Sequence, residues 1–463
     1  MLTTWLVSHF AWIGGFLLAV VLLAHIIRQR RSPTATIAWI LFIVSAPYVG
    51  IPFYLLFGGR KVARMARGKA DVRLPEIEAE TAASFPPLER ILSANGIPPA
   101  TGGNRMVLCP TGEQSYGALM DLIESASERI DLCFFILHPD RVGRDVMERL
   151  ARRAAEGIEV RLLLDGVGSL HTRARFLKPL ARAGGRFSFF NPVLHHPLRG
   201  RANLRNHRKV VIVDGRKVLA GGANVACEYM GPEARPDRWR DLTFVIEGPA
   251  VAHYARLFDA DWCYASNEPL DGGRQPHESV REDAGKAWLQ VVPSGPDIPG
   301  DALYDALLTA IFSATRRLWL VTPYFIPDDA LTRAIILAAH RGIDVRILVP
   351  ARSNHWVADV AGRSYLREIQ QEGGTVLQYE LGMVHAKGVL VDDRLALLGS
   401  ANIDMRSLLL NYEVAMLVYS MAEIRQVEEW MRGLMSGCKK GVEEATAVGE
   451  LGEGLARLLA PQL

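Results

Sequence analysis

One short motif occurs twice in this 463-residue chain and constrains its fold more than any other feature. Both copies read His-x-Lys-x-x-x-x-Asp. The first copy holds His207, Lys209 and Asp214, and the second holds His385, Lys387 and Asp392. In both copies an asparagine, Asn224 or Asn402, follows 17 residues after the histidine. One match of this kind is weak, but two matches with equal spacing and similar tails indicate an internal duplication.

The sequence around the two motifs repeats as well, which predicts two similar halves. Residues 116–130 align with residues 304–318 as amphipathic helices, and each is followed by a short apolar strand. Gly157 and Gly342 then end a second helix and lead into a buried strand. Alternating helices and strands predict an α/β fold, with two similar α/β-sheet domains related by a pseudo-two-fold axis. The expected domains are residues 106–285 and residues 286–463.

Each motif places its histidine and its lysine for joint use. Residues 209–213 are apolar and β-branched after the lysine and lead into Asp-Gly, which predicts a buried strand that enters a turn. Side chains at positions i and i+2 of a strand share a face, so the histidine and lysine of each motif point together. Asp214 and Asp392 fall on the opposite parity. We therefore expect these carboxylates to cap the turns, or to pair with a buried cation, and not to contact a substrate.

Two histidines and two lysines in one site suit the chemistry of a phosphodiester. One neutral imidazole can attack phosphorus, and a second, protonated imidazole can donate to the leaving group. The lysines and asparagines supply positive charge and hydrogen-bond donors to the phosphoryl oxygens. A zinc site is the competing interpretation, which is disfavoured because a charged lysine has no lone pair and no further ligand stands at zinc spacing. The residues predict a phosphohistidine intermediate, with no metal and no other cofactor.

At these residues the chain resembles the phospholipase D superfamily, whose signature is the duplicated motif, and within it the bacterial cardiolipin synthases. In the first half the resemblance rests on Asn206-His207-Arg208-Lys209, Gly221-Gly222-Ala223-Asn224, Glu228-Tyr229 and Trp239-Arg240-Asp241. In the second half it rests on the run from Gly399 to Ser407, on Asn411 and on Glu413. The resemblance covers nearly the whole chain. It implies two α/β domains with the active site in the cleft between them.

The resemblance also implies a reaction, in which two phosphatidylglycerols are joined into cardiolipin with release of glycerol. The implied catalytic set is the two motifs, that is His207, Lys209, Asp214, His385, Lys387 and Asp392. In this scheme His207 attacks the phosphate and protonated His385 serves the leaving glycerol. The phosphoryl oxygens are held by the two lysines together with Asn224, Asn402 and Ser400. Asp241 and Glu413 each accept from an imidazole N–H and fix its tautomer. The choice of His207 as nucleophile rests on the resemblance alone.

Four other functions compete with this one. A phospholipase D would admit water to the same site, and a phosphatidylserine synthase would use serine as the acceptor. A nuclease is less favoured, because it needs no membrane anchor and because a net charge of +3 is small for a protein that binds nucleic acid. A membrane scaffold without activity has no use for two intact motifs. The run from Arg199 to Lys209 is densely basic, and it forms either an attractor for an anionic headgroup or a solvated charged face.

The N-terminal 69 residues are expected to anchor the chain in a membrane. Residues 1–27 and residues 32–59 carry no Asp, Glu, Lys or Arg, and each run exceeds the roughly 20 residues that cross a bilayer as a helix. We therefore predict two transmembrane helices, the second kinked or re-entrant at Pro47 and Pro52. Basic residues after the second run favour a cytoplasmic catalytic portion, whereas those between Arg28 and Arg31 argue the other way.

A linker, acidic and rich in proline, is expected over residues 70–105, with one short helix at residues 87–94. The five cysteines make no disulfide framework and indicate buried thiols in a reducing compartment. Together with the resemblance, these features predict a multi-pass protein of a bacterial inner membrane. Its expected partners are phosphatidylglycerol and membrane lipid, and no nucleic acid.

Overall fold

The computed structural model describes residues 20, 24, 33–57, 69, 71–77, 85–172, 174–192, 204–269 and 284–459 of the chain. The chain divides into two compact units. The first comprises Met1–Arg67 with Leu194–Asn203, and the second comprises Gly68–Val193 with Leu204–Leu463. Both halves of the internal repeat belong to the second unit, so the candidate site lies within one compact body.

Two short uncharged helices make up most of what is described of the first unit. They are α2 (Pro33–Ser45) and α3 (Pro47–Phe57). Pro47 has no amide hydrogen to donate into α2, so it ends the one helix and begins the next. Gly50 permits close contact between the two, because a Cβ there would lie 2.8 Å from the Phe42 carbonyl oxygen. Within the described ranges, no helix is both long and apolar enough to cross a membrane.

Over residues 32–59, where a kinked or re-entrant transmembrane helix was predicted, the structure describes these two helices. The break that Pro47 predicted is found, and it leaves helices of 13 and 11 residues in place of one span. The first predicted segment, residues 1–27, lies outside the described residues except for Val20 and Ala24.

The second unit holds α4 (Pro86–Ala94), close to the short helix predicted at residues 87–94, and then the repeat. The first half runs β1 (Thr101–Cys109), α5 (Gly112–Ser125), β2 (Arg129–Phe134), α6 (Arg141–Ala155), β3 (Glu159–Asp165), α7 (Ala174–Arg182), β4 (Arg186–Phe190), β5 (Val210–Val213), β6 (Lys217–Gly221), β7 (Thr243–Glu247) and α8 (Val251–Ser266). The second half runs β8 (Ala287–Ser294), α9 (Ala302–Ser313), β9 (Arg317–Val321), β10 (Phe325–Ile326), α10 (Asp329–His340), β11 (Asp344–Pro350), α11 (Trp356–Gln371), β12 (Thr375–Tyr379), β13 (Gly388–Val391), β14 (Leu395–Gly399), β15 (Ile403–Asp404), α12 (Met405–Leu409), β16 (Glu413–Val418), α13 (Met421–Met435), β17 (Cys438–Lys440) and α14 (Ala447–Leu459).

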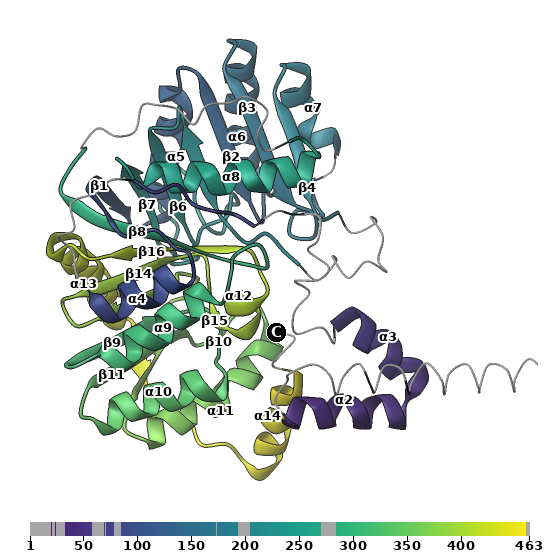
Figure 1. Cartoon of the computed structure of the whole chain (residues 1–463), viewed down its shortest axis with the longest axis vertical. Helices are drawn as coiled ribbons and strands as arrows, with labels where there is room; N and C mark the ends of the chain where they lie inside the picture. The colour runs from purple at the N-terminus through teal and green to yellow at the C-terminus, as the bar shows by residue number, and fades with distance from the viewer. Residues whose placement is uncertain are drawn as a thin grey trace, which may run out of the picture. The chain divides into compact units, whose positions relative to one another are not determined.

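Most of the strands of the described chain form one 15-stranded sheet, while β10 and β15 pair separately. The sheet has the order β17-β12-β11-β9-β13-β14-β16-β8-β1-β7-β6-β5-β2-β3-β4. Its two sides repeat each other outward from the antiparallel pair of β1 and β8 (Figure 1). One side continues as β7-β6-β5-β2-β3-β4, and the other as β16-β14-β13-β9-β11-β12. The matching strand orders on the two sides agree with the predicted duplication and with a pseudo-two-fold relation between the halves. β1 begins at Thr101, inside the stretch predicted as a linker.

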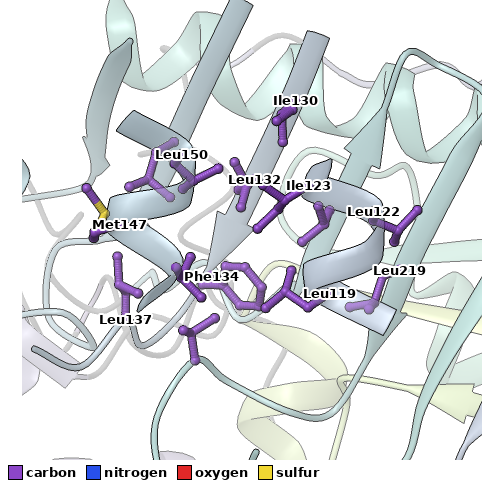
Figure 2. Close-up of a cluster of buried hydrophobic side chains, with 14 of the residues drawn as sticks. Leu119, Leu122, Ile123, Ile130, Leu132, Phe134, Leu137, Met147, Leu150 and Leu219 are labelled. Atoms are coloured by element: carbon purple, nitrogen blue, oxygen red, sulfur yellow. The ribbon is translucent and has the colours of Figure 1, made fainter. Parts of the chain in front are cut away.

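Helices cover both faces of the sheet in the first half. Ile130, Leu132 and Phe134 of β2 pack with residues of α5 and α6 in a buried apolar cluster (Figure 2). Alternate strand residues face α8, where the Arg161 guanidinium lies 4.9 Å from the centre of the Phe258 ring. Successive side chains of a strand point to opposite faces, so both faces of the sheet are buried. The nearly continuous apolar runs in the strands predicted this arrangement.

Candidate active site

Backbone bridges between the two halves hold both motif histidines. The His207 amide donates to the Tyr412 carbonyl oxygen at 2.9 Å, and the Tyr412 amide donates to the Arg205 carbonyl oxygen at 3.0 Å. Asn206 and Tyr412 thereby form a parallel β-bridge. The segment before β5, which carries the first histidine, is therefore joined to the segment before β16 in the second half.

The second motif is held by the first half in the same way. The His385 amide donates to the Arg240 carbonyl oxygen at 2.7 Å, and the Arg240 amide donates to the Met383 carbonyl oxygen at 2.7 Å. Arg240 and Val384 form the matching parallel bridge. The two contacts are related by the repeat, because Tyr412 and Arg240 each stand directly before an acid.

Each histidine therefore meets a carboxylate from the opposite half. His207 Nδ1 lies 3.0 Å from Glu413 Oε1, and His385 Nδ1 lies 2.6 Å from Asp241 Oδ2. Both carboxylates are buried. An acid at Nδ1 favours the tautomer with its proton on Nδ1, which leaves the Nε2 lone pair for chemistry. The structure thus brings both predicted acids to the histidines and crosses them between the halves, which the sequence spacing did not indicate.

Each carboxylate is supported by a residue of its own half. Ser400 Oγ donates to Glu413 Oε2 at 2.5 Å, and the Leu242 amide donates to Asp241 Oδ1 at 2.8 Å. Gly222 occupies the position of Ser400 in the first copy, and a Cβ there would collide with Asp241 Oδ1. Ser400, which was predicted to bind the phosphate, therefore donates its hydroxyl hydrogen to Glu413 in this structure.

The two lysines lie against the histidines of their own motifs. Lys209 Nζ donates to the His207 carbonyl oxygen at 2.6 Å. Lys387 Nζ donates to the His385 carbonyl oxygen and lies 2.8 Å from Nδ1 and 3.1 Å from Nε2 of the same ring. Burial lowers the pKa of Lys209 to about 7 and that of Lys387 to about 8, because a buried ammonium loses its hydration. An anion beside these groups would stabilise their charge.

Burial also favours neutral imidazoles. It is the main cause that lowers the pKa of His385 to about 3, with Lys387 acting in the same direction and Asp241 opposing. The pKa of His207 is lowered by burial and by both lysines, against the opposing Glu413. A neutral imidazole suits a nucleophile. A proton donor in this site needs the charge of a bound anion beside it.

Aromatic rings form the walls around the two imidazoles. The Phe135 ring, at the end of β2, packs edge-on against His207 with centroids 4.7 Å apart. The Tyr229 and Trp239 rings pack against His385 at 5.0 Å and 5.5 Å. These ring contacts restrict the planes of the two imidazoles. Phe135 was missed by sequence reasoning, since a phenylalanine that ends an apolar strand carries no signal of its own.

The two motif asparagines are buried and have different partners. Asn224 Oδ1 accepts from the Ile136 amide at 3.0 Å, and its side chain also bonds Tyr229. Asn402 bonds Asp404, and its Oδ1 atom finds no partner among the described residues. Asn402 and Lys387 line one small cavity together with apolar residues of α9 and α12. The structure thus ties Asn224 to the protein itself and leaves Asn402 beside a motif lysine.

The two motif aspartates hold the turns that precede β2 and β9. Asp214 accepts from the amides of Ser127, Glu128 and Arg129, each at 2.8 Å, and from the Ser127 hydroxyl. Asp392 accepts in the same way from the amides of residues 315–317 and from a threonine hydroxyl. Burial would raise the pKa of both carboxyls, but these hydrogen bonds outweigh it and lower the pKa.

These contacts agree with the interpretation that Asp214 and Asp392 cap turns, and in this structure both carboxylates bond to the protein itself. They also explain where two helices end. The helices were predicted to continue to residues 130 and 318, but α5 ends at Ser125 and α9 at Ser313. The next amides bond to a carboxylate instead of to the preceding turn of helix.

The basic run before the first motif is not a charged surface where the structure describes it. Arg205 and Arg208 are buried. Arg205 pairs with Asp165 at 3.3 Å, and Arg208 pairs with Asp261 at 2.8 Å. Neither expected use of the run, attraction of a headgroup or a solvated face, applies to these two arginines. The part of the run before residue 204 lies outside the described residues.

Comparisons with known proteins agree with this geometry. The family model described as cardiolipin synthase, PLD-like domain, matches residues 119–262 and 307–435, and the phospholipase D-nuclease N-terminal model matches residues 17–59. Cardiolipin synthase 1 of Bacillus anthracis is 34% identical over 420 residues, which cover 86% of this chain and 82% of that protein. Cardiolipin synthase A of Pseudomonas entomophila is 33% identical over 470 residues, which cover 96% of each chain.

Among solved structures, phosphatidylserine synthase of Haemophilus influenzae has a TM-score of 0.61, covers 81% of this chain and 97% of its own, and is 19% identical. That likeness shows a shared fold. Paired α/β halves with a duplicated His/Lys motif and crossed carboxylates define a phospholipase D-like protein. The chain belongs to the cardiolipin synthase family with the PLD-like domain.

Proposed function

We propose that the chain is a phosphatidyltransferase that condenses two phosphatidylglycerols into cardiolipin and glycerol. The observation that carries the proposal is the pair of crossed His–carboxylate contacts, His207 with Glu413 and His385 with Asp241. Two equivalent imidazoles, each with its own acid, suit a reaction in which one forms a covalent bond and the other moves protons. The lipid substrate is supported by relatives named cardiolipin synthase that align over most of the chain.

In the first step, His207 Nε2 attacks phosphorus, and the bond between phosphorus and the leaving glycerol oxygen breaks. His385 gives its proton to that oxygen. Burial favours a neutral His385, so its proton is taken up with the phosphodiester, whose negative charge stabilises the imidazolium beside Asp241. The product of this step is a phosphatidyl-histidine and free glycerol.

In the second step, neutral His385 removes the proton from a hydroxyl of the second phosphatidylglycerol. That oxygen attacks phosphorus, the bond to His207 breaks, and cardiolipin leaves. Lys209 and Lys387 stabilise the phosphoryl oxygens, and Asn402 is the candidate amide donor beside them, with Asn224 in the matching place of the first half. No metal takes part in either step.

The same proposal includes a membrane location. The N-terminal model match over residues 17–59 and the uncharged helices α2 and α3 support a region of residues 1–69 that holds the enzyme at a bacterial cell membrane. The catalytic domains, residues 106–285 and 286–463, then lie on the cytoplasmic face and take phosphatidylglycerol from the bilayer. Protease digestion of intact spheroplasts tests the side, because a cytoplasmic domain is protected until the membrane is opened.

The decisive experiment supplies labelled phosphatidylglycerol to membranes that contain the wild type, His207→Ala or His340→Ala, and separates the lipid products. His340 is a half-exposed surface histidine that pairs with Glu372, so it is the matched control. We expect labelled cardiolipin and glycerol from the wild type and the control, and neither from His207→Ala. Phosphatidic acid as the main product would show a hydrolase, and a product that appears only with added serine would show a phosphatidylserine synthase.

The covalent intermediate is tested in His385→Ala, because loss of the base slows its breakdown. Labelled lipid is added, the reaction is stopped by a brief acid quench, and the peptides are handled in base. Label on the His207 peptide supports the proposed nucleophile. Label on the peptide that carries residue 385 in the His207→Ala protein would exchange the two roles.

A further inference from the structure

A cluster of buried charges lies beside the His207 half of the site and is not used by the mechanism above. It consists of Lys69, Arg208, Asp261 and Asp297, which we call the Lys69 cluster. The Lys69 ammonium contacts Asp261 Oδ1 and lies 2.6 Å from Asp297 Oδ2, and all three side chains are at most 2% exposed. Arg208 Nη1 lies 2.9 Å and 2.8 Å from the two oxygens of Asp261. The cluster therefore holds two cations against two carboxylates.

Arg208 connects this cluster to the catalytic pair. It follows His207 in the sequence, and its Nε donates to the Glu413 carbonyl oxygen at 3.1 Å. Lys69 Nζ itself lies 4.5 Å from the centre of the Tyr412 ring. Tyr412 forms the backbone bridge that holds the His207 segment. The Lys69 cluster thus touches the chain on both sides of the contact between His207 and Glu413.

The cluster also joins the two halves of the repeat to the segment that follows the N-terminal hydrophobic region. Asp261 belongs to α8 of the first half, and Asp297 follows β8 of the second. The Val72 amide donates to the Asp297 carbonyl oxygen at 2.9 Å. Farther along the same segment, His253 Nε2 of α8 lies 3.0 Å from the Pro75 carbonyl oxygen. This stretch therefore packs against the catalytic unit, with the side chains of Val72 and Leu74 buried.

The second half of the repeat has no counterpart of Arg208 in this cluster, so within the described site the cluster contacts only the His207 motif. The position of Arg208 in the second motif is occupied by Ala386, and that of Asn206 by Val384. No guanidinium can therefore extend from the second motif to a matching pair of acids. Asn206 adds to the difference, because its Nδ2 donates to Asp261 Oδ2 at 2.8 Å.

We propose that Lys69 is a positioning residue for the His207–Glu413 pair, so that the segment after the N-terminal hydrophobic region completes the catalytic centre. The proposal rests on the proposed function in that His207 carries the reaction. Without Lys69, two buried carboxylates face one guanidinium. Arg208 Nη2 already lies 3.9 Å from Asp297 Oδ1, so Arg208 is drawn toward the unpaired acid and away from the Glu413 backbone.

The test compares four variants of the full chain in membranes: Lys69→Met, Lys69→Arg, the double variant Lys69→Met/Asp297→Asn, and the control Lys217→Met. Lys217 forms a surface pair with Glu247 and is 42% exposed. Lys69→Met should lower kcat by roughly 10- to 100-fold with little change in KM, because it displaces a reacting group and not a lipid contact. Lys69→Arg keeps the charge and should recover most of the activity.

A pH profile separates positioning from a general loss of stability. The ionisable groups that face His207 are Glu413, Lys209 and Lys387, and none of them changes in these variants. Lys69→Met leaves an excess carboxylate charge beside the His207 segment, which should raise the pKa of His207, so we expect the acidic limb of kcat/KM to move to higher pH. The double variant removes one positive and one negative charge, so its limb should return toward that of the wild type.

Wild-type kcat and an unshifted acidic limb in folded Lys69→Met would overturn the proposal. If that variant fails to fold, Lys69→Arg and the double variant decide. An inactive, folded Lys69→Arg, together with a double variant whose acidic limb stays shifted to higher pH, would also overturn the proposal. The effect of the Lys69 substitutions on kcat and on the acidic limb can be measured with any reaction in which His207 takes part, including hydrolysis. A wild type that hydrolyses lipid without making cardiolipin would therefore refute the proposed acceptor, while the same Lys69 response would still support the cluster.

Discussion

Replacing Asp392 with alanine tests whether the motif aspartate is structural. Its carboxylate accepts four hydrogen bonds, three from backbone amides and one from the Thr315 hydroxyl. A hydrogen bond to a charged group contributes about 1.5–3 kcal/mol, but water can satisfy part of these donors at a partly exposed turn. The backbone φ of Asp392 is 52°, and a left-handed residue with a Cβ costs a further ~1–2 kcal/mol unless it is Asn or Asp. We expect Asp392→Ala to lower the free energy of unfolding by about 3–4 kcal/mol.

The assay is thermal unfolding of the full chain in detergent, together with the activity of the protein that remains folded. Asp392→Asn tolerates the positive φ and keeps one acceptor oxygen, so it should lose less than half as much stability. Asp393→Ala is the neighbouring control, since Asp393 is 38% exposed and pairs at the surface with Arg316 and also with Arg317, which keeps Glu428 as a partner. Such a surface pair contributes at most about 1 kcal/mol.

The pH dependence of this stabilisation has a definite sign. Burial opposes the ionised form of Asp392, but its hydrogen bonds lower its native pKa, so its contribution is present above the ordinary aspartate pKa. It is lost as pH falls through the native pKa, and wild type and Asp392→Ala should then converge. The reasoning is refuted if Asp392→Ala melts like the wild type at neutral pH but has lost its activity, because the carboxylate would then act in the reaction.

Three further predictions follow from the site. Glu413→Gln and Asp241→Asn should each lower kcat by about 10²–10⁴-fold without unfolding the chain, because each removes the charge that fixes one imidazole. Steady-state rates, measured at equal amounts of folded protein, check this prediction. Normal rates would show that the acids are not needed. For the free enzyme, kcat/KM should fall above about pH 7, because burial lowers the pKa of Lys209 to about 7 and a neutral amine binds phosphate poorly. Lys209→Arg should move this alkaline limb to higher pH, because a guanidinium stays charged there. EDTA should leave turnover unchanged, and an EDTA-sensitive rate restored by zinc would contradict the phosphohistidine route.

The sequence was sufficient to predict the duplicated fold, and it named the two histidines, two lysines and two acids that the structure brings close to one another. Equal spacing of His207 and His385 from their motif partners is a property of the chain alone, and strand parity separates each histidine from its aspartate. The exchange of Glu413 and Asp241 between the halves was not accessible in this way. It depends on the register of the backbone bridge at Tyr412, and no local pattern records which segment of the other half lies beside it.

Two other features show why local signals were insufficient. Lys69 stands in a basic stretch that predicts a membrane flank, and only tertiary contacts bring its ammonium to Asp261 and Asp297. Ser400 matched the family pattern and was therefore expected at the phosphate. The first copy has Gly222 at that position, and this difference was an available sign that the residue supports its own acid instead of a shared ligand.

The crossed carboxylates make each half dependent on the other. A single half, taken alone, would present a histidine without its acid and an acid without its histidine. Two identical halves related by a two-fold axis would complete both pairs at once, since each would lend its carboxylate to its partner. The crossed contacts of the present chain are therefore arranged as they would be in a symmetric dimer whose two subunits have been joined into one polypeptide. Once joined, the halves were free to differ, as Arg208 and Ala386 do, but neither could lose its acid without disabling the histidine of the other.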